Sequence, residues 1–240
     1  MQPLINLRGG GPVDHLAICG PDTRQAAAEV EALTGIAPHL GEPEPGQFYW
    51  SASLSLGHRR FLEILGPNPA YRGFNPLTET VRRFDRLRPV FWYVGTDDFE
   101  GFSARSKALG APVERIQRVS YTYEATGDLI DYTRGVVGPG FRSARPCVIQ
   151  WDKRPERVEP EQRLELRALR LTDPGAERLR NLFKALGIEQ PVETGAAHIA
   201  VDLDTPKGPI TFEGPGIALE GLSGAARLLS LYAKYLLPFT

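Results

Sequence analysis

The stretch Val13-Asp14-His15-Leu16-Ala17-Ile18, followed by Gly20-Pro21-Asp22-Thr23, decides the fold because its plan recurs twice further along the chain. The opening run is apolar and typical of a strand, and the residues after Asp22 favour a helix that ends at Thr34-Gly35. An Asp oxygen can accept hydrogen bonds from the first free amides of a helix, and glycine just past the end tolerates left-handed geometry. The stretch therefore predicts a strand followed by a capped helix.

Two further segments follow the same plan at nearly even intervals. Pro89 to Val94 precedes Asp97 and a helical stretch that ends at Gly110, and Leu164 to Leu171 precedes Asp173 and a helical stretch that ends at Gly187. Asp22 and Asp97 are 75 positions apart, and Asp97 and Asp173 are 76 apart. Such regular spacing predicts three copies of one unit.

Each helix is followed by strand-like stretches separated by turn residues. In the first copy, Phe48 to Leu56 and Arg60 to Leu65 flank a Gly57-His58 turn and predict a hairpin. The predicted strands of the other copies are Ile116 to Tyr123, Ile130 to Val137, Cys147 to Trp151, Pro191 to Thr194, His198 to Leu203 and Pro209 to Phe212. Each unit is therefore predicted to be a βαβββ module.

The predicted fold class is α+β. We expect residues 1–152 to form a domain of two modules, 12–67 and 88–152, and residues 153–240 to hold a third module, 164–213. A short helix is predicted within Thr78 to Leu87, and an apolar helix over Ser223 to Leu237. The terminal helix is expected either to cover an open sheet face or to form a homodimer contact.

Composition and charge narrow the classes of function. The 240 residues carry a net charge of −1, which provides no field to attract nucleic acid or an anionic membrane. Cys19 and Cys147, the two cysteines, lack the spacing of a disulfide framework or a zinc finger. With no apolar signal region and no long apolar run, we expect a cytoplasmic protein. Phosphate-loop and dinucleotide motifs are absent, so no nucleotide cofactor is expected.

The chain resembles the vicinal oxygen chelate superfamily, and within it the glyoxalase-like proteins. The residues that carry the resemblance are Val13 to Leu16, Leu33-Thr34-Gly35, Leu54 to Gly57 with Phe61 to Pro67, and Pro146 to Trp151. It covers about residues 12 to 152, and beyond Lys153 it rests on the third repeat alone. The resemblance implies that two modules pair their curved sheets around a site for a small molecule.

The resemblance also implies metal ligands on the first and last strands of each module. In the first module these positions are His15 and Glu63, whose side chains suit zinc, iron, manganese or nickel. Glu63 stands between apolar neighbours, where a lone carboxylate is costly unless it faces a cleft, a metal or a cation. The alternatives are a strand histidine bonded to a carbonyl and a glutamate that faces outward.

The second module departs from this pattern. Aligning Asp97 with Asp22 places Val90, which cannot bind a metal, opposite His15. Aligning the closing strands places Gln150, a neutral and weaker donor, opposite Glu63. The expected metal ligands are therefore His15, Glu63 and Gln150. In the third module the matching positions fall near Leu166 and Thr211 or Phe212, so no second metal site is expected there.

The aromatic residues Trp50, Trp92 and Trp151 are expected to line a substrate pocket, with core packing as the alternative. The leading hypothesis is a metalloenzyme of the lyase or isomerase type, in which a divalent ion stabilises an oxyanion and Glu63 moves the proton. Glyoxalase I activity and ring-opening dioxygenation fit the residues less well. The competing hypothesis is a protein of the same fold that binds and sequesters a small molecule without a metal.

Overall fold

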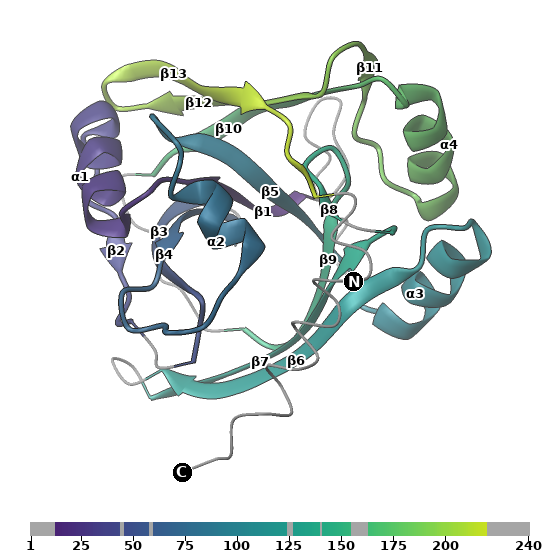
Figure 1. The fold of residues 1–240 in the computed structure, drawn as a ribbon, viewed down its shortest axis with the longest axis horizontal. Coiled ribbons are helices and arrows are strands. Elements are labelled where there is room, and N and C mark those ends of the chain that lie inside the picture. The colour runs from purple at the N-terminus through teal and green to yellow at the C-terminus, as the bar shows by residue number, and fades with distance from the viewer. Residues whose placement is uncertain are drawn as a thin grey trace.

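The computed structural model describes residues 13–43, 46–57, 60–123, 127–139, 141–154 and 163–219. The elements in chain order are β1 (Val13–Cys19), α1 (Thr23–Thr34), β2 (His39–Leu40), β3 (Tyr49–Gly57), β4 (Arg60–Pro67), α2 (Pro76–Val81), β5 (Arg88–Gly95), α3 (Phe99–Ala108), β6 (Val113–Tyr123), β7 (Asp128–Val137), β8 (Phe141–Arg142), β9 (Cys147–Lys153), β10 (Glu165–Asp173), α4 (Ala176–Leu186), β11 (Glu193–Thr194), β12 (His198–Thr205), β13 (Gly208–Pro215) and β14 (Ala218–Leu219). The predicted α+β class is confirmed (Figure 1).

The helix boundaries follow the expected capping chemistry in the first two modules. Asp22 accepts a hydrogen bond from the Gln25 amide at 2.9 Å, and Gly35 ends α1 with a φ of 79°. Asp98 caps α3 by accepting from the Gly101 amide at 2.8 Å. The cap of α3 is thus Asp98, one residue beyond the Asp97 used to align the repeats.

The third helix, α4, starts differently from the expected pattern. Its first cap position is Gly175, with no side-chain cap, although Gly187 ends it in left-handed geometry with a φ of 74°. Asp173 is the last residue of β10 and accepts from the Gly175 amide at 2.7 Å. Pro174 and Gly175 lie between Asp173 and the start of α4, so Asp173, the expected cap, bonds the Gly175 amide instead of an amide of the helix. The short helix predicted within Thr78 to Leu87 is α2, which begins earlier because Asn75 caps it.

The first two modules share one sheet of eight strands in the order β2-β3-β4-β1-β5-β9-β7-β6. The predicted hairpin is confirmed as β3 and β4, which pair antiparallel. In each module the first strand pairs parallel with the last, β1 with β4 and β5 with β9. The two modules join where β1 and β5 pair antiparallel, so this contact makes the two half-sheets continuous.

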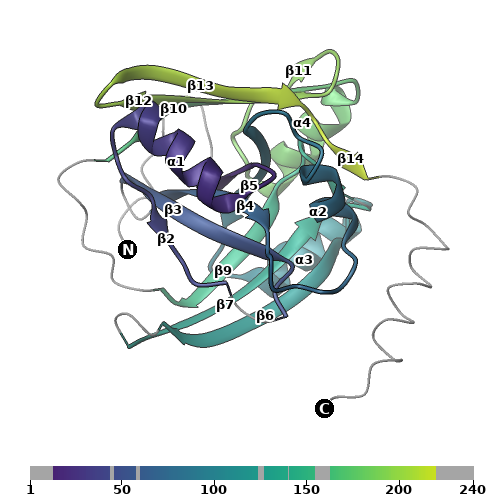
Figure 2. The same cartoon turned by 60° about the vertical axis from the view of Figure 1, so that its left-hand side comes forward.

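The sheet curls, and its two faces pack differently (Figures 1 and 2). We call the face that carries His15, Glu63 and Tyr93 the inner face. Helix α2 packs on one end of it, with Leu77 and Val81 against Cys19 and Leu65. The outer face packs against α1 and α3, and the largest apolar cluster of the structure lies there. The inner face is therefore the less densely covered of the two.

The third module forms a separate sheet in the order β11-β10-β12-β13. Its apolar face, including Leu171, Ile199 and Phe212, joins the core on the outer face of the large sheet. Phe183 of α4 contacts Trp92 of β5 edge-on, with ring centroids 5.6 Å apart. The open sheet face of this module is therefore buried against the first two modules.

Two expectations concern parts of the chain or partners that the structure does not describe. The helix predicted over Ser223 to Leu237 lies outside the described residues, and the homodimer stays a prediction. No helix among the described residues is both long enough and apolar enough to span a bilayer.

Replacing Phe183 with alanine tests the packing of the third module on the others. Phe183 is 1% exposed, so the change leaves a cavity against Trp92 and is expected to cost about 3–5 kcal/mol of unfolding free energy. Chemical denaturation followed by circular dichroism measures this. The control is Phe74→Ala, which removes a ring that is 71% exposed and is expected to change stability by less than about 0.5 kcal/mol. Equal effects of the two variants would contradict the packing described.

Candidate functional site on the inner face

Strand register places His15 and Glu63 on the same face of the sheet. His15 pairs with Phe61 across the parallel contact between β1 and β4, and Ala17 pairs with Glu63. Phe61 and Glu63 are two residues apart, so both point to the side that carries the His15 ring. The two side chains predicted to act together are thus on neighbouring strands and share the inner face.

A bulge in β1 brings Asp14 to His15. Val13 pairs with Val94 and His15 with Tyr93, so Asp14 is an extra residue opposite two consecutive residues of β5. A bulge redirects side chains that strict alternation would place on opposite faces. Here the Nδ1 atom of His15 lies 2.6 Å from an Asp14 carboxylate oxygen. Since an ionised carboxylate only accepts, Nδ1–H is the donor, and the neutral tautomer that this bond selects carries its lone pair on Nε2.

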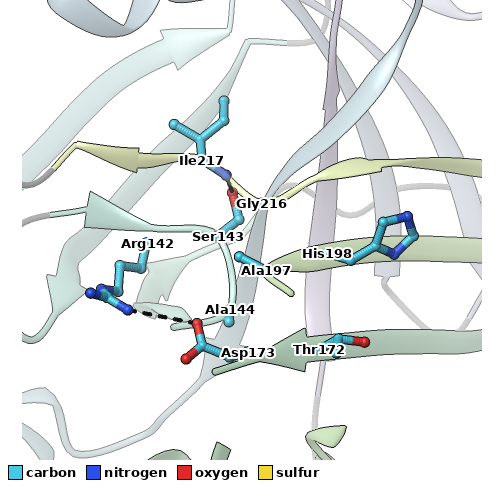
Figure 3. A pocket seen from close by; sticks show the side chains of 9 residues that line it. All are labelled: Arg142, Ser143, Ala144, Thr172, Asp173, Ala197, His198, Gly216 and Ile217. Carbon is cyan, nitrogen blue, oxygen red and sulfur yellow. Dashed lines mark hydrogen bonds and ion pairs between the residues drawn. The ribbon is translucent and has the colours of Figure 1, made fainter. Parts of the chain in front are cut away.

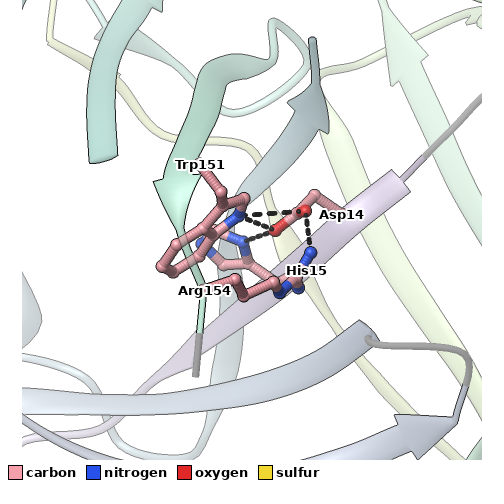
Figure 4. A network of polar contacts seen from close by, with 4 residues as sticks. All are labelled: Asp14, His15, Trp151 and Arg154. Atoms are coloured by element: carbon pink, nitrogen blue, oxygen red, sulfur yellow. Dashed lines mark hydrogen bonds and ion pairs between the residues drawn. The ribbon is translucent and has the colours of Figure 1, made fainter. Parts of the chain in front are cut away.

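Asp14 is the centre of a buried polar network (Figure 4). Besides His15, it accepts from the indole of Trp151 at 3.2 Å and from Nη1 of Arg154 at 2.9 Å. Burial raises the pKa of the Asp14 carboxyl, but hydrogen bonding and charge attraction from His15, with the Arg154 charge and the Trp151 bond, more than offset it and leave the pKa lowered. Asp14 therefore stays ionised and fixes the imidazole.

The imidazole of His15 is also held by two aromatic rings. Its centroid lies 4.3 Å from that of Phe61 and 3.8 Å from that of Tyr93, and both pairs are nearly parallel. His15 is 4% exposed, and none of the hydrogen bonds among the described residues engages Nε2. The ring is thus fixed in position, with one nitrogen left for chemistry.

Glu63 projects into the space shared by several inner-face side chains. It is half-buried, and its negative charge raises the pKa of the buried thiols Cys19 and Cys147 and of the phenols Tyr93 and Tyr132. For all four groups, desolvation by burial is the larger cause. All four therefore stay protonated near neutral pH.

Gln150 lies on the other face of the sheet. Its Oε1 accepts from the Phe99 amide at the start of α3 at 2.8 Å, and its amide donates to Asp152 at 3.0 Å. It therefore completes the cap of α3 from the outer face. The structure does not bring Gln150 together with His15 and Glu63.

The strand pairing also corrects the alignment of the two modules. Because α1 and α3 are capped by Asp22 and Asp98, equivalent residues are 76 positions apart, and Phe91 rather than Val90 corresponds to His15. Ala17 pairs with Glu63 as its equivalent Tyr93 pairs with Cys147, so Cys147 corresponds to Glu63. The second module thus offers a phenyl ring and a thiol.

The described residues do not fit a resident divalent metal. Protein sites for zinc usually have three or four protein ligands. No group of three or more His, Cys, Asp or Glu side chains in the described part of the chain is arranged to hold an ion. The remaining candidate, Cys147, has a thiol whose pKa burial raises to about 12, which disfavours the thiolate that binds metals. On the inner face, His15 and Glu63 therefore remain as two donors.

The three tryptophans do not form one pocket. Trp151 is on the inner face, where it contacts Tyr132 with ring centroids 5.0 Å apart. Trp50 is on the outer face under Arg24 of α1 and donates to the Gly41 carbonyl at 2.6 Å. Trp92 is fully buried in the core against Phe183. The structure therefore brings only Trp151 of the three together with His15.

Arg134 of β7 is an inner-face residue that sequence reasoning missed. Its Nε and Nη2 both donate to Oε1 of Gln117, at 3.2 and 3.1 Å. Its guanidinium carbon lies 5.6 Å from the ring centroid of Tyr49, although four strands separate β7 from β3 within the sheet. The curl of the sheet thus brings both modules to one place. No recognisable motif surrounds Arg134 in the sequence. The polar pair Asp14-His15 inside an apolar strand was a usable signal, but strict alternation predicts that the two side chains point to opposite faces.

A polar hollow away from the inner face is too small for an organic ligand (Figure 3). It lies between β8 and the third module, where Arg142 approaches Asp173 at 3.8 Å. Its volume of about 20 Å³ has room for roughly one water molecule. The inner face remains the candidate functional site.

The sequence from residue 13 to residue 187 matches the family described as the glyoxalase-like domain. The protein belongs to this family, which is part of the vicinal oxygen chelate superfamily. The resemblance found in the sequence is thereby confirmed. No curated protein sequence matches the chain.

Two of the solved structures that match, with TM-scores above 0.5, show the same fold at low sequence identity. A hypothetical protein from Staphylococcus aureus is 12% identical with a TM-score of 0.53, and the match covers 84% of both chains. A mutant 4-hydroxymandelate synthase from Streptomyces coelicolor is 18% identical with a TM-score of 0.51, over 86% of this chain and 63% of that one. Methylmalonyl-CoA epimerase from Mycobacterium tuberculosis is 13% identical with a TM-score of 0.42, over 60% and 89%.

Replacing Asp14 with asparagine tests the network. The variant removes the buried carboxylate charge that faces Arg154, so we expect a loss of roughly 2 kcal/mol of stability at pH 7. Because the folded-state pKa is lowered, the wild-type advantage is present above the unfolded value near 3.8 and disappears as the pH falls further. Denaturation of both proteins between pH 3 and 7 measures it.

The matched control for this prediction is Asp97→Asn, which changes an exposed aspartate before α3. It is expected to alter stability by less than about 0.5 kcal/mol. An Asp14→Asn loss that did not shrink at low pH would contradict an ionised Asp14.

Proposed function

We propose that this protein is a metal-independent enzyme of the lyase or isomerase type that transfers a proton on a small organic molecule bound at the inner face. The observation that carries the proposal is the buried Asp14–His15 pair, in which the carboxylate fixes Nδ1–H and leaves the Nε2 lone pair available. An imidazole oriented in this way is a general base that can take a proton and return it.

The proposed step concerns a carbon beside a carbonyl group. Nε2 of His15 takes the proton of a hydroxyl-bearing carbon, and the electron pair of the broken C–H bond moves toward the carbonyl oxygen to give an enediolate. The proton is then returned to the same carbon, or to the adjacent carbon when the hydroxyl proton passes to the other oxygen. Glu63, on the same face, is the second acid–base group. The protonated hydroxyls of Tyr93 and Tyr132 are donors for the oxyanion that develops.

The metal hypothesis remains the second candidate because one feature favours it. A carboxylate on the far nitrogen of an imidazole is a common arrangement behind metal-bound histidines. The donor set argues against it, since His15 and Glu63 are two donors, Phe91 cannot bind an ion, and Cys147 holds its proton. Zinc, iron, manganese or nickel would thus lack a complete set of ligands among the described residues.

A third candidate is a protein that binds or sequesters a small molecule without acting on it. It uses the same inner face, and the aromatic rings of Phe61, Tyr93, Tyr132 and Trp151 support it. It differs from the leading proposal in that no proton is transferred on the bound molecule. Location in the cytoplasm is proposed as well, since Cys19 and Cys147 form no disulfide.

Deuterium exchange tests proton transfer without knowledge of the natural substrate. Hydroxyacetone and hydroxypyruvate both have exchangeable hydrogens beside a carbonyl, and ¹H NMR in D₂O follows their loss. The wild type is expected to accelerate the exchange of at least one. His15→Asn and Glu63→Gln are expected to reduce this acceleration by about 10²- to 10⁴-fold.

The matched control is His198→Asn, which changes a histidine of the third module far along the chain from the site. It is expected to retain the wild-type rate. If the wild type accelerates neither exchange, the proton-transfer proposal is contradicted and the third candidate, a protein that only binds a small molecule, is favoured.

Elemental analysis of protein purified without chelator separates the metal hypothesis from the proposal. We expect far less than one metal ion per chain. Near-stoichiometric metal that is lost in both His15→Ala and Glu63→Ala would overturn the metal-independent proposal.

A further inference from the structure

Arg134 carries a positive charge on the inner face that no carboxylate neutralises within the described residues. Two other arginines with part of their surface buried have such partners: Arg154 lies 2.9 Å from Asp14, and Arg88 pairs with Asp85. None of the ion pairs among the described residues involves Arg134. Its contacts are to Gln117 and to the hydroxyl of Tyr49, which are both neutral.

A charge in this setting costs free energy that a ligand can recover. Arg134 is mostly removed from water, and a partly buried charge without a counterion is unfavourable. Burial lowers the pKa of the Arg134 guanidinium, but the surrounding tyrosines, including a hydrogen bond to Tyr49, more than offset this effect and leave the pKa raised, so the group keeps its proton. The permanent charge therefore favours an anion as its partner.

The surroundings of Arg134 define the rest of the ligand. The rings of Tyr49 and Tyr132 have their centroids 5.6 and 5.9 Å from its guanidinium carbon. Trp151 continues this aromatic wall from Tyr132 toward Asp14 and His15. These side chains are partly exposed, so a small molecule can reach them. Flat aromatic surfaces beside a cation favour a planar apolar group attached to an anion.

We propose that Arg134 binds the carboxylate of an aromatic carboxylic acid. Its guanidinium supplies the positive charge that a metal ion would otherwise supply, since the inner face has no complete metal site. This rests on the proposed function in that both use the inner face. The planar guanidinium presents parallel N–H donors that match two oxygens of a carboxylate. The aromatic part of the ligand then lies along Tyr132 and Trp151 and brings its reacting carbon toward His15 and Glu63.

The negative charge of Glu63 provides a second way to test the proposal. Its negative charge acts on Tyr93, Tyr132 and Cys147, and the positive charge of Arg134 acts on the same three groups in the opposite direction. The two side chains are not an ion pair among the described contacts. A carboxylate at Arg134 is therefore attracted by one charge and repelled by the other, and the two substitutions must change its affinity in opposite directions.

The test compares three carboxylates with their neutral amides. The probes are benzoate, phenylacetate and salicylate against benzamide, phenylacetamide and salicylamide, with calorimetric titration and thermal denaturation as readouts. At least one carboxylate is expected to bind the wild type and raise its melting temperature, whereas its amide does neither. Arg134→Gln is expected to weaken binding by about tenfold or more, and Glu63→Gln is expected to strengthen it.

Arg118→Gln is the matched control. Arg118 is on β6, the strand beside β7, with its side chain 72% exposed, and its loss is expected to leave carboxylate binding unchanged. Arg134→Lys keeps the charge but loses the paired donors, and it is expected to bind with intermediate affinity, so this variant decides the matter if Arg134→Gln does not fold.

The proposal is overturned if no carboxylate binds better than its amide. It is also overturned if Arg134→Gln and Arg118→Gln weaken carboxylate binding to the same extent. Carboxylate binding through Arg134 without deuterium exchange would contradict the proton-transfer function and leave the anion site standing. Deuterium exchange without carboxylate binding would contradict the anion site and leave the proton-transfer function standing.

Discussion

The antiparallel contact between β1 and β5 is the interaction on which the rest of the structure depends. It converts two half-sheets into one curled sheet of eight strands, and it carries the bulge at Asp14. Without the continuous sheet, Tyr49 of the first module would not reach Arg134 of the second. Without the bulge, Asp14 and His15 would point to opposite faces. Architecture and candidate chemistry thus originate in the same few residue pairs.

The inner face combines two polar groups that differ in how their charges are balanced. At Asp14, charge is fully compensated, because His15, Trp151 and Arg154 all donate to one carboxylate. At Arg134 it is compensated only by neutral oxygens. The first arrangement fixes a side chain in place, and the second leaves a demand for an external anion. This asymmetry is the physical basis for assigning proton transfer to His15 and ligand recognition to Arg134.

Much of the fold was predictable from local chemistry because caps, glycines and alternation leave clear patterns. Asp22 and Gly35 bound α1 as expected, and the hairpin of β3 and β4 follows its alternation. The site was less accessible, because a shift of one residue changes the face of a strand. Counting from Asp97 instead of Asp98 made Val90 the counterpart of His15, and aligning the closing strands made Gln150 the counterpart of Glu63, whereas the strand pairing gives Phe91 and Cys147. His15 and Glu63 share a face as predicted. The Asp14 contact depends on a bulge and the Arg134 contact on the curl of the sheet, and neither is visible in one strand.

The separation of the three tryptophans between the two faces has a spectroscopic consequence. Trp50 and Trp92 are enclosed by α1 and by the core around Phe183, so their indoles emit from surroundings that a bound molecule does not change. Trp151 donates its indole hydrogen to Asp14 and lies beside the guanidinium of Arg154. Its fluorescence therefore arises within the polar network itself, and the chain contains a native optical reporter on the state of its own inner face.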